Sequence, residues 1–169
     1  MADLYKFSER VMKMDDVAWK RHANPKSVWT RVAVLPLFVL AVWSRVWIGW
    51  WALLPIIILI TFIWWNPRVF QPPASTRNWA SKGTFGERIF LNRNIQPIPQ
   101  HHQTVAYILT LFAAIGLIPL ALGLFWLTPW MALFGLILVV CSKLWFVDRM
   151  AWLYEDMKDT DRIYQSWLY

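Results

Sequence analysis

The chain has 169 residues, of which 58% are hydrophobic, with 14 tryptophans and a formal net charge of +7. A soluble domain of this size is less apolar, so the composition indicates an integral membrane protein that forms one compact domain. The single cysteine excludes an intramolecular disulfide. The basic residues cluster beside apolar stretches, so we expect them to face anionic lipid and not nucleic acid.

Residues 1–22 carry the pattern of an amphipathic helix. Their apolar positions recur three and four residues apart, and charged residues occupy most of the remaining helix surface. Such a helix is typical of a segment lying along the membrane surface, and packing on the protein's own loops is compatible with it. No short apolar core with a small-residue cleavage site follows Met1, so no cleavable signal peptide is expected.

Residues 28–65 are expected to form a first helical hairpin. Asn24 and Pro25 suit a helix N-cap and a first helical position. Two apolar runs follow, at 28–43 and 50–65, joined by a short connection. Each is shorter than the about 20 residues that a spanning helix needs, so each must borrow flanking residues or bend.

Residues 66–104 are predicted to form a cytoplasmic loop, and residues 105–147 a second hairpin. The last span is expected to continue as a helical tail over 148–169, because the sequence that follows it contains no Gly or Pro as far as Asp159. Small residues share a face in each span of this hairpin, which predicts close packing between them or against a partner. The fold class is therefore an all-α membrane protein with four transmembrane helices in two antiparallel hairpins; two re-entrant hairpins are the less favoured alternative.

The basic residues predict the orientation of these spans. Sixteen of the 17 lie before or at the start of the first span, in the central loop, or at and beyond the end of the fourth span, and only Arg45 lies on the opposite side. By the positive-inside rule both termini and the central loop face the cytoplasm, across the cytoplasmic (inner) membrane. Tryptophans concentrate at the predicted span ends, as in an interfacial aromatic belt.

The predicted spans lack an ionisable residue near their centres. This argues against charge-relay transport, against a haem held between the helices and against a retinal-type Schiff base. Candidate polar chemistry is therefore confined to the cytoplasmic side, where distant segments can meet. The candidate anion- or lipid-headgroup-binding residues are Arg21, Lys26, Arg68, Arg88 and Arg93. A polar interfacial cluster is expected from His22, Asn24, Asn66, Glu87, His101, His102, Asp148, Arg149, Glu155 and Asp156.

Three interpretations of these residues remain open. Generic attraction to anionic headgroups is favoured over a specific lipid pocket. The carboxylates are expected to pair with arginines and to hold the loop to the fourth helix, with Glu87 bound by Arg21, Arg68 or Arg149. Three histidines with carboxylates could bind zinc or iron. Adjacent residues on a helix point about 100° apart, however, so His101 and His102 are not expected to share one ion, and no metal site is predicted.

Five segments carry a resemblance to a known family. They are "WKRHANPKSVWTR" (19–31), "WNPRVFQPP" (65–73), "SKGTFGERIFLNR" (81–93), "PIPQHH" (97–102) and "KLWFVDRMAWLYEDM" (143–157). Together they resemble a family of small uncharacterised prokaryotic integral membrane proteins, a domain of unknown function sharing RHANP, GER-x-x-LNR and P-x-PxHH segments. The resemblance implies four spans and distinctive polar segments, and it implies no activity.

The function favoured by the sequence is non-catalytic. No nucleophile with an adjacent base, phosphate-binding loop or nucleotide fingerprint is present, so no catalytic residue and no cofactor is assigned. We expect an accessory, assembly or stabilising subunit of a larger membrane complex, in contact with the bilayer and with other membrane-protein subunits. The alternative is a membrane enzyme or a lipid- or quinone-binding protein with an interfacial site around His22, Glu87, His101 and His102. A channel is the third hypothesis.

Overall fold

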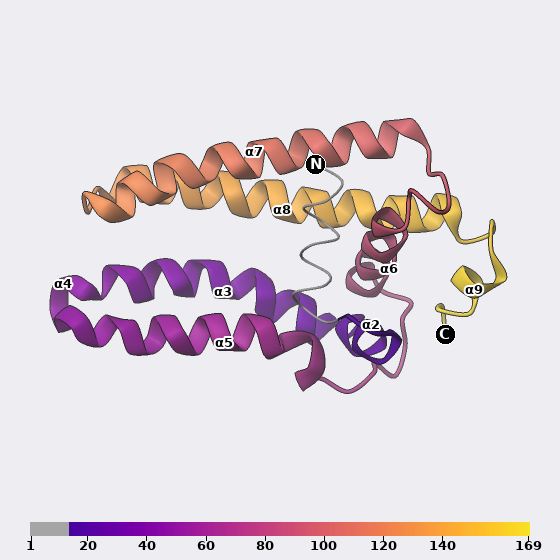
Figure 1. The fold of residues 1–169 in the computed structure, drawn as a ribbon, viewed down its shortest axis with the longest axis horizontal. Coiled ribbons are helices and arrows are strands. Elements are labelled where there is room, and N and C mark those ends of the chain that lie inside the picture. Colours follow the sequence, from indigo (N-terminus) through magenta and orange to yellow (C-terminus); the bar gives the residue numbers. More distant parts are fainter. Residues whose placement is uncertain (1–13) are drawn as a thin grey trace. The chain divides into compact units, whose positions relative to one another are not determined.

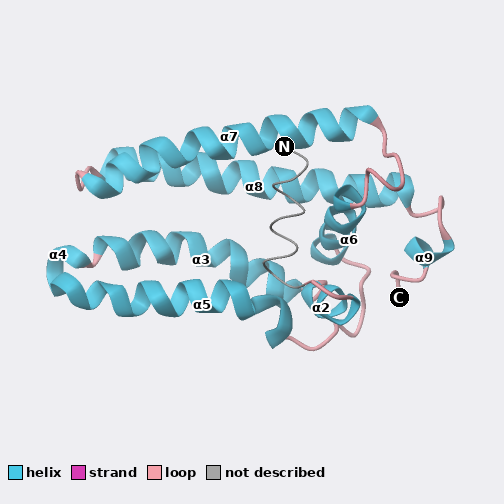
Figure 2. Ribbon diagram, viewed as in Figure 1, coloured by secondary structure: helices cyan, strands magenta, loops and turns pink. Residues whose placement is uncertain are grey.

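The structure is a computed structural model that describes residues 14–169, and in this part of the chain it is helical, without strands (Figures 1 and 2). The expected helix over residues 1–22 therefore lies largely outside the described residues, and its last turns form α2. The elements are α2 (Asp16–His22), α3 (Pro25–Trp43), α4 (Arg45–Ile48), the 3₁₀ helix η1 (Gly49–Ala52), α5 (Leu53–Val69), α6 (Trp79–Leu91), α7 (Gln100–Phe125), α8 (Pro129–Met157) and α9 (Arg162–Gln165).

Three helical segments among the described residues are long and apolar enough to cross a membrane, which indicates a membrane protein. They are Pro25–Val69, Gln100–Phe125 and Pro129–Met157. The first segment contains both α3 and α5. The chain turns back at α4 and η1, so α5 returns in the direction opposite to α3 (Figure 1).

The described chain divides into two compact units. The apolar unit comprises residues 30–65 and 106–146, and the polar unit comprises 14–29, 66–105 and 147–169. The first six residues of α7 and the last eleven of α8 are thus part of the polar unit, and they precede or follow the apolar stretches of these helices.

Two glycines allow α7 and α8 to pack closely in the apolar unit. A Cβ atom added at Gly135 would lie 2.3 Å from the backbone nitrogen of Leu120, and one added at Gly123 would lie 2.3 Å from the backbone nitrogen of Ala132. The helix backbones therefore approach more closely than any side chain would permit. This confirms the prediction that the small-residue faces of these two helices pack together.

Arg45 caps the far end of α7 within the same unit. Its guanidinium donates to the backbone carbonyls of Leu124 and Phe125, the latter at 2.9 Å. The last carbonyls of a helix have no partner within the helix, and a cation there also interacts favourably with the helix dipole. The one basic residue outside the predicted cytoplasmic side thus has a structural contact.

Residues 66–104 are not only a loop. They contain α6, whose N-cap Asn78 accepts a hydrogen bond from the backbone of Ser81. The core of the polar unit is formed by α6 and the end of α8, with Phe90, Met150 and Tyr154 fully buried. The segment predicted as a cytoplasmic loop thus contains a helix with two glycines, which packing on α8 stabilises.

Candidate functional site

A buried hydrogen-bond chain joins the start of α3 to the end of α5. The hydroxyl of Ser27 donates to the side-chain oxygen of Asn66 at 2.7 Å, and Nδ1 of His22 lies 2.8 Å from the same hydroxyl. Because the Ser27 proton is used on Asn66, His22 acts as the donor, with its proton on Nδ1. All three side chains are buried. The arrangement satisfies polar groups inside the fold.

Neighbouring polar residues extend this scaffold. Ser81 donates to the carbonyl of Ala23 at 2.6 Å, which attaches α6 to the turn between α2 and α3. Arg21 donates to the carbonyl of Arg68 at 3.1 Å, and Asn24 donates to the carbonyl of Gln71 at 2.9 Å. The RHANP segment therefore connects α2 to the chain that leaves α5.

The five candidate anion-binding residues have different environments. Arg21 contacts the carbonyl of Arg68, as described above, and Arg88 forms an ion pair with Asp16. Arg93 is buried and donates to the carbonyl of Phe90 at 2.7 Å. The backbone N–H of Lys26 donates to the side chain of Asn24. The guanidiniums of Arg21, Arg88 and Arg93 thus each have a partner within the fold.

Arg88 also lies beside a cavity of about 600 Å³ in the polar unit. Its guanidinium carbon is 4.7 Å from the ring centre of Trp167 and 6.0 Å from that of Trp19. Aromatic faces on two sides and the carboxylate of Asp16 fix the position of this guanidinium. Arg88 therefore has a structural role at the cavity wall.

Asp148 and Glu155 of α8 bind α6, but through partners other than the expected arginines. Glu155 lies 2.5 Å from the amine of Lys82 and 2.7 Å from that of Lys158. The indole N–H of Trp79 donates to Asp148 at 2.8 Å. Hydrogen bonds from Lys158 and then Lys82 hold the pKa of Glu155 below its ordinary value. The expected contacts between the central segment and the fourth helix are present. The prediction that Asp148 and Glu155 pair with arginines is wrong.

Two further residues of the polar interfacial cluster have other surroundings. The guanidinium carbon of Arg149 lies 5.5 Å from the ring centre of Trp152. Glu87 is half-buried on α6. Its pairing with Arg21, Arg68 or Arg149 stays a prediction.

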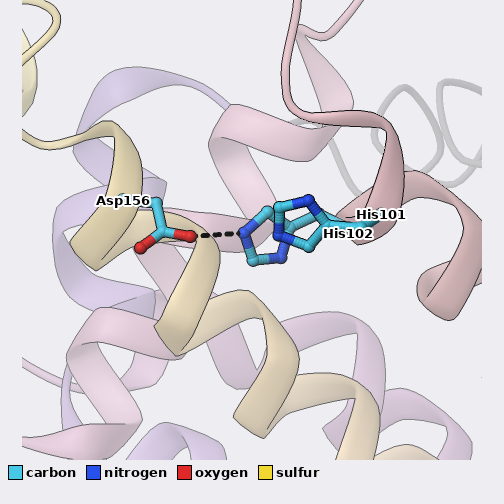
Figure 3. Close-up of side chains that lie close together, drawn as sticks. All are labelled: His101, His102 and Asp156. Carbon is cyan, nitrogen blue, oxygen red and sulfur yellow. Dashed lines mark hydrogen bonds and ion pairs between the residues drawn. The ribbon is translucent and has the colours of Figure 1, made fainter.

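His101, His102 and Asp156 form the most concentrated group of potential ligands among the described residues (Figure 3). The histidines lie in the first turn of α7 and Asp156 in the last turn of α8. Nε2 of His102 is 2.8 Å from a carboxylate oxygen of Asp156, and the two imidazole centres are 4.1 Å apart. One ligand atom from each residue lies within 4.8 Å of the others.

His102 is held in a defined protonation state. Its side chain is only 1% exposed, and burial lowers its pKa below the usual 6.5, although the hydrogen bond to Asp156 opposes this shift. Neutral His102 donates from Nε2 to Asp156, so Nδ1 carries the lone pair. That Nδ1 is buried and has no hydrogen-bond partner in the described part of the chain.

The expectation that neighbouring histidines would point apart is wrong at this position. The Cα–Cβ bonds of adjacent helical residues point about 100° apart, but each imidazole ring extends several ångströms beyond its Cβ atom. At the first turn of a helix no preceding turn restricts the side-chain rotamers. The rings of His101 and His102 can therefore converge, which sequence spacing alone did not indicate.

Two glycines position α6, and neither is among the residues predicted from the sequence. A Cβ at Gly86 would lie 1.7 Å from the carbonyl oxygen of Met150, and one at Gly83 would lie 2.6 Å from a methyl group of Val147. Their spacing of three residues places both on one helix face, and this pattern could have predicted the close approach to α8.

Comparison with known proteins gives a family and no further identity. No curated protein and no solved structure matches the chain. A family model described as a family of unknown function matches residues 7–166, so the chain belongs to the family DUF6653.

Proposed function

We propose that this protein is a non-catalytic stabilising or assembly subunit of a larger complex in the inner membrane. The carrying observation is that polar residues in the RHANP and GERIFLNR segments make contacts within the fold. The buried chain from His22 through Ser27 to Asn66 is the clearest case. A set of polar groups that satisfy one another supports a scaffold more than a reaction site. We further propose that these segments are the family's distinctive feature.

The proposed topology has four spans with both termini and the central polar segment in the cytoplasm. It is supported by the basic residues, since 16 of the 17 fall on one side of such a topology. Reporter fusions after Tyr169 and within residues 44–49 test it. We expect a cytoplasmic signal from the first and a signal from the opposite side from the second; the reverse result rejects the topology.

One apolar surface available to a partner is on α5. Leu54, Ile58 and neighbouring apolar side chains of this helix are exposed in the chain by itself. Lipid covers such a surface in any membrane protein, so exposure is compatible with a partner and does not require one. The experiment must therefore distinguish protein from lipid.

Site-specific photo-crosslinking in the native membrane makes this distinction. A photoreactive residue at Leu54 or Ile58 is expected to give a discrete adduct with another protein. The matched control is Ala132 on α8, which is only 3% exposed and faces α7. Adducts with lipid alone at the α5 positions, together with a purified protein that has no stoichiometric partner, would contradict the proposal.

The alternative site around His22, Glu87, His101 and His102 has weaker support. It requires His22 to act with the two adjacent histidines. His22 contacts Ser27 and its ring lies beside that of Trp19, whereas His102 contacts Asp156 and His101. The two groups of residues thus have different partners, and we do not propose one enzymatic site that contains both.

A further inference from the structure

Two neighbouring histidines and one distant aspartate converge where α7 begins and α8 ends. His102 and Asp156 are 54 residues apart in sequence, yet Nε2 of His102 and Oδ2 of Asp156 are 2.8 Å apart. His101 completes the group, with its imidazole next to that of His102 (Figure 3). Two imidazoles and a carboxylate are ligand types that zinc and similar divalent metals accept.

The unsatisfied nitrogen of His102 is a second, independent observation. The ring is 1% exposed, and its Nδ1 has no hydrogen-bond partner in the described residues. Buried polar atoms are nearly always paired, so an orphan atom in a group of metal-binding side chains suggests a missing partner. Because Nε2 donates to Asp156, Nδ1 presents a lone pair, which can bind a cation and cannot donate a hydrogen bond.

The carboxylate of Asp156 has the position that a metal-binding histidine requires. A histidine that binds a metal through one nitrogen usually donates its other N–H to a carboxylate or carbonyl, which fixes the tautomer and the ring orientation. Asp156 makes this contact with His102, and its side chain is about half exposed. Its negative charge also offsets the nearby positive charge of Arg149, which acts on His102 from the same unit.

We infer that this cluster binds one divalent transition-metal ion of the zinc type, with His102 Nδ1 and a nitrogen of His101 as ligands and Asp156 orienting His102. Nitrogen ligands at about 2.0–2.1 Å from zinc are about 3.3 Å apart in a tetrahedral site. One potential ligand atom of each of the three residues lies within 4.8 Å of the others, and the two imidazole centres are 4.1 Å apart, so the two ligand nitrogens need to come closer together. His101 is exposed and can make this movement by side-chain rotation. Water fills the remaining positions of such a site, which is open on the side of His101.

The consequence for the protein is that a bound ion would stabilise the folded conformation of the polar unit at the start of α7. His101 and His102 belong to the start of α7, and Asp156 belongs to the end of α8. An ion held by the two histidines restrains the start of α7, and the hydrogen bond between His102 and Asp156 connects that helix end to the end of α8. Ligand binding that is confined to the folded state raises its stability, so the metal should raise the thermal unfolding midpoint.

The test uses full-length protein that carries no polyhistidine tag, purified in mild detergent and treated with EDTA. Zinc chloride or magnesium chloride is added, unbound ions are removed by gel filtration, and the metal content per chain and the unfolding midpoint are measured. We expect about one zinc ion per chain and a higher midpoint. Magnesium should have no effect, because it prefers oxygen ligands.

Two variants and a control assign the binding to these residues. His101→Gln removes an exposed ligand, and Asp156→Asn removes the orienting charge; each should weaken zinc binding by about tenfold or more. Asp159→Asn removes a nearby exposed carboxylate outside the cluster and should bind zinc as the wild type does. Absence of zinc binding in the wild type overturns the inference, and so does wild-type affinity in either His101→Gln or Asp156→Asn.

Discussion

Gly86→Ala is the sharpest test of how α6 packs on α8. The added Cβ would lie 1.7 Å from the carbonyl oxygen of Met150, 2.4 Å from its carbonyl carbon and 3.0 Å from its Cα. A carbon and an oxygen in ordinary contact are about 3.3 Å apart, so α6 must retreat by about 1.5 Å. A backbone carbonyl cannot rotate away as a side chain can, and the residues around it are fully buried.

The expected change in the free energy of unfolding for Gly86→Ala is the balance of two effects. Overpacking costs about 1–3 kcal/mol, and we take the upper end because the clash is with backbone. Replacing glycine by alanine inside a helix favours folding by about 1 kcal/mol. The net loss in the free energy of unfolding is therefore about 2 kcal/mol. For a chain of this size, this lowers the unfolding midpoint by about 4–8 °C.

The assay is thermal unfolding in mild detergent, followed by tryptophan fluorescence. Gly83→Ala is the matched control on the same helix face. Its Cβ would meet a methyl group of Val147 at 2.6 Å, which can rotate, and the carbonyl oxygen of Val147 at 3.1 Å. We expect a change of no more than about 1 kcal/mol there, since the gain in helix propensity offsets a softer clash. Gly86→Ala protein at least as stable as Gly83→Ala protein would refute the close packing described here.

Three further predictions concern stability in the same assay. Asn66→Leu removes the acceptor of a buried hydroxyl and should cost about 1–3 kcal/mol. Gly135→Ala should destabilise more than Gly116→Ala, because the first clashes with backbone and the second with side chains; equal effects would contradict this ranking. The pKa of Glu155 is lowered mainly by Lys158, so its stabilising effect is present above the unfolded value of 4.5 and is lost as pH falls through the folded pKa. Glu155→Gln should therefore reduce the acid-induced drop in unfolding midpoint below pH 5, and an unchanged pH profile would contradict the assignment.

The helical class and the packing between α7 and α8 could be predicted because both depend on local patterns. Apolar length predicts candidate spans, and glycines at helical spacing, such as Gly116 and Gly123, mark a face where backbones approach. The position of α6 could not be predicted in the same way. Gly83 and Gly86 lower its intrinsic helix propensity, and the helix gains its stability from burial against the end of α8.

Partner choice among the polar residues was less predictable. Charge composition indicated correctly that carboxylates near the end of α8 would be paired, but it predicted arginine partners. Glu155 instead contacts Lys82 and Lys158, and Asp148 contacts an indole. The contacts with Lys82 and Trp79 depend on where α6 lies, and no helix was predicted there, so these two partners could not be predicted either.

The length of α8 explains why the candidate metal site can exist. The helix has 29 residues, and at 1.5 Å per residue it is about 44 Å long. The hydrocarbon core of a bilayer is about 30 Å thick, so a spanning α8 extends about 14 Å, or roughly nine residues, beyond it. Glu155 and Asp156 fall in this extension, where a carboxylate keeps its charge without the cost of burial in lipid. Asp156 can then orient His102, whose burial comes from protein and not from the membrane. The cluster of His101, His102 and Asp156 thus depends on the part of α8 that continues beyond the apolar stretch.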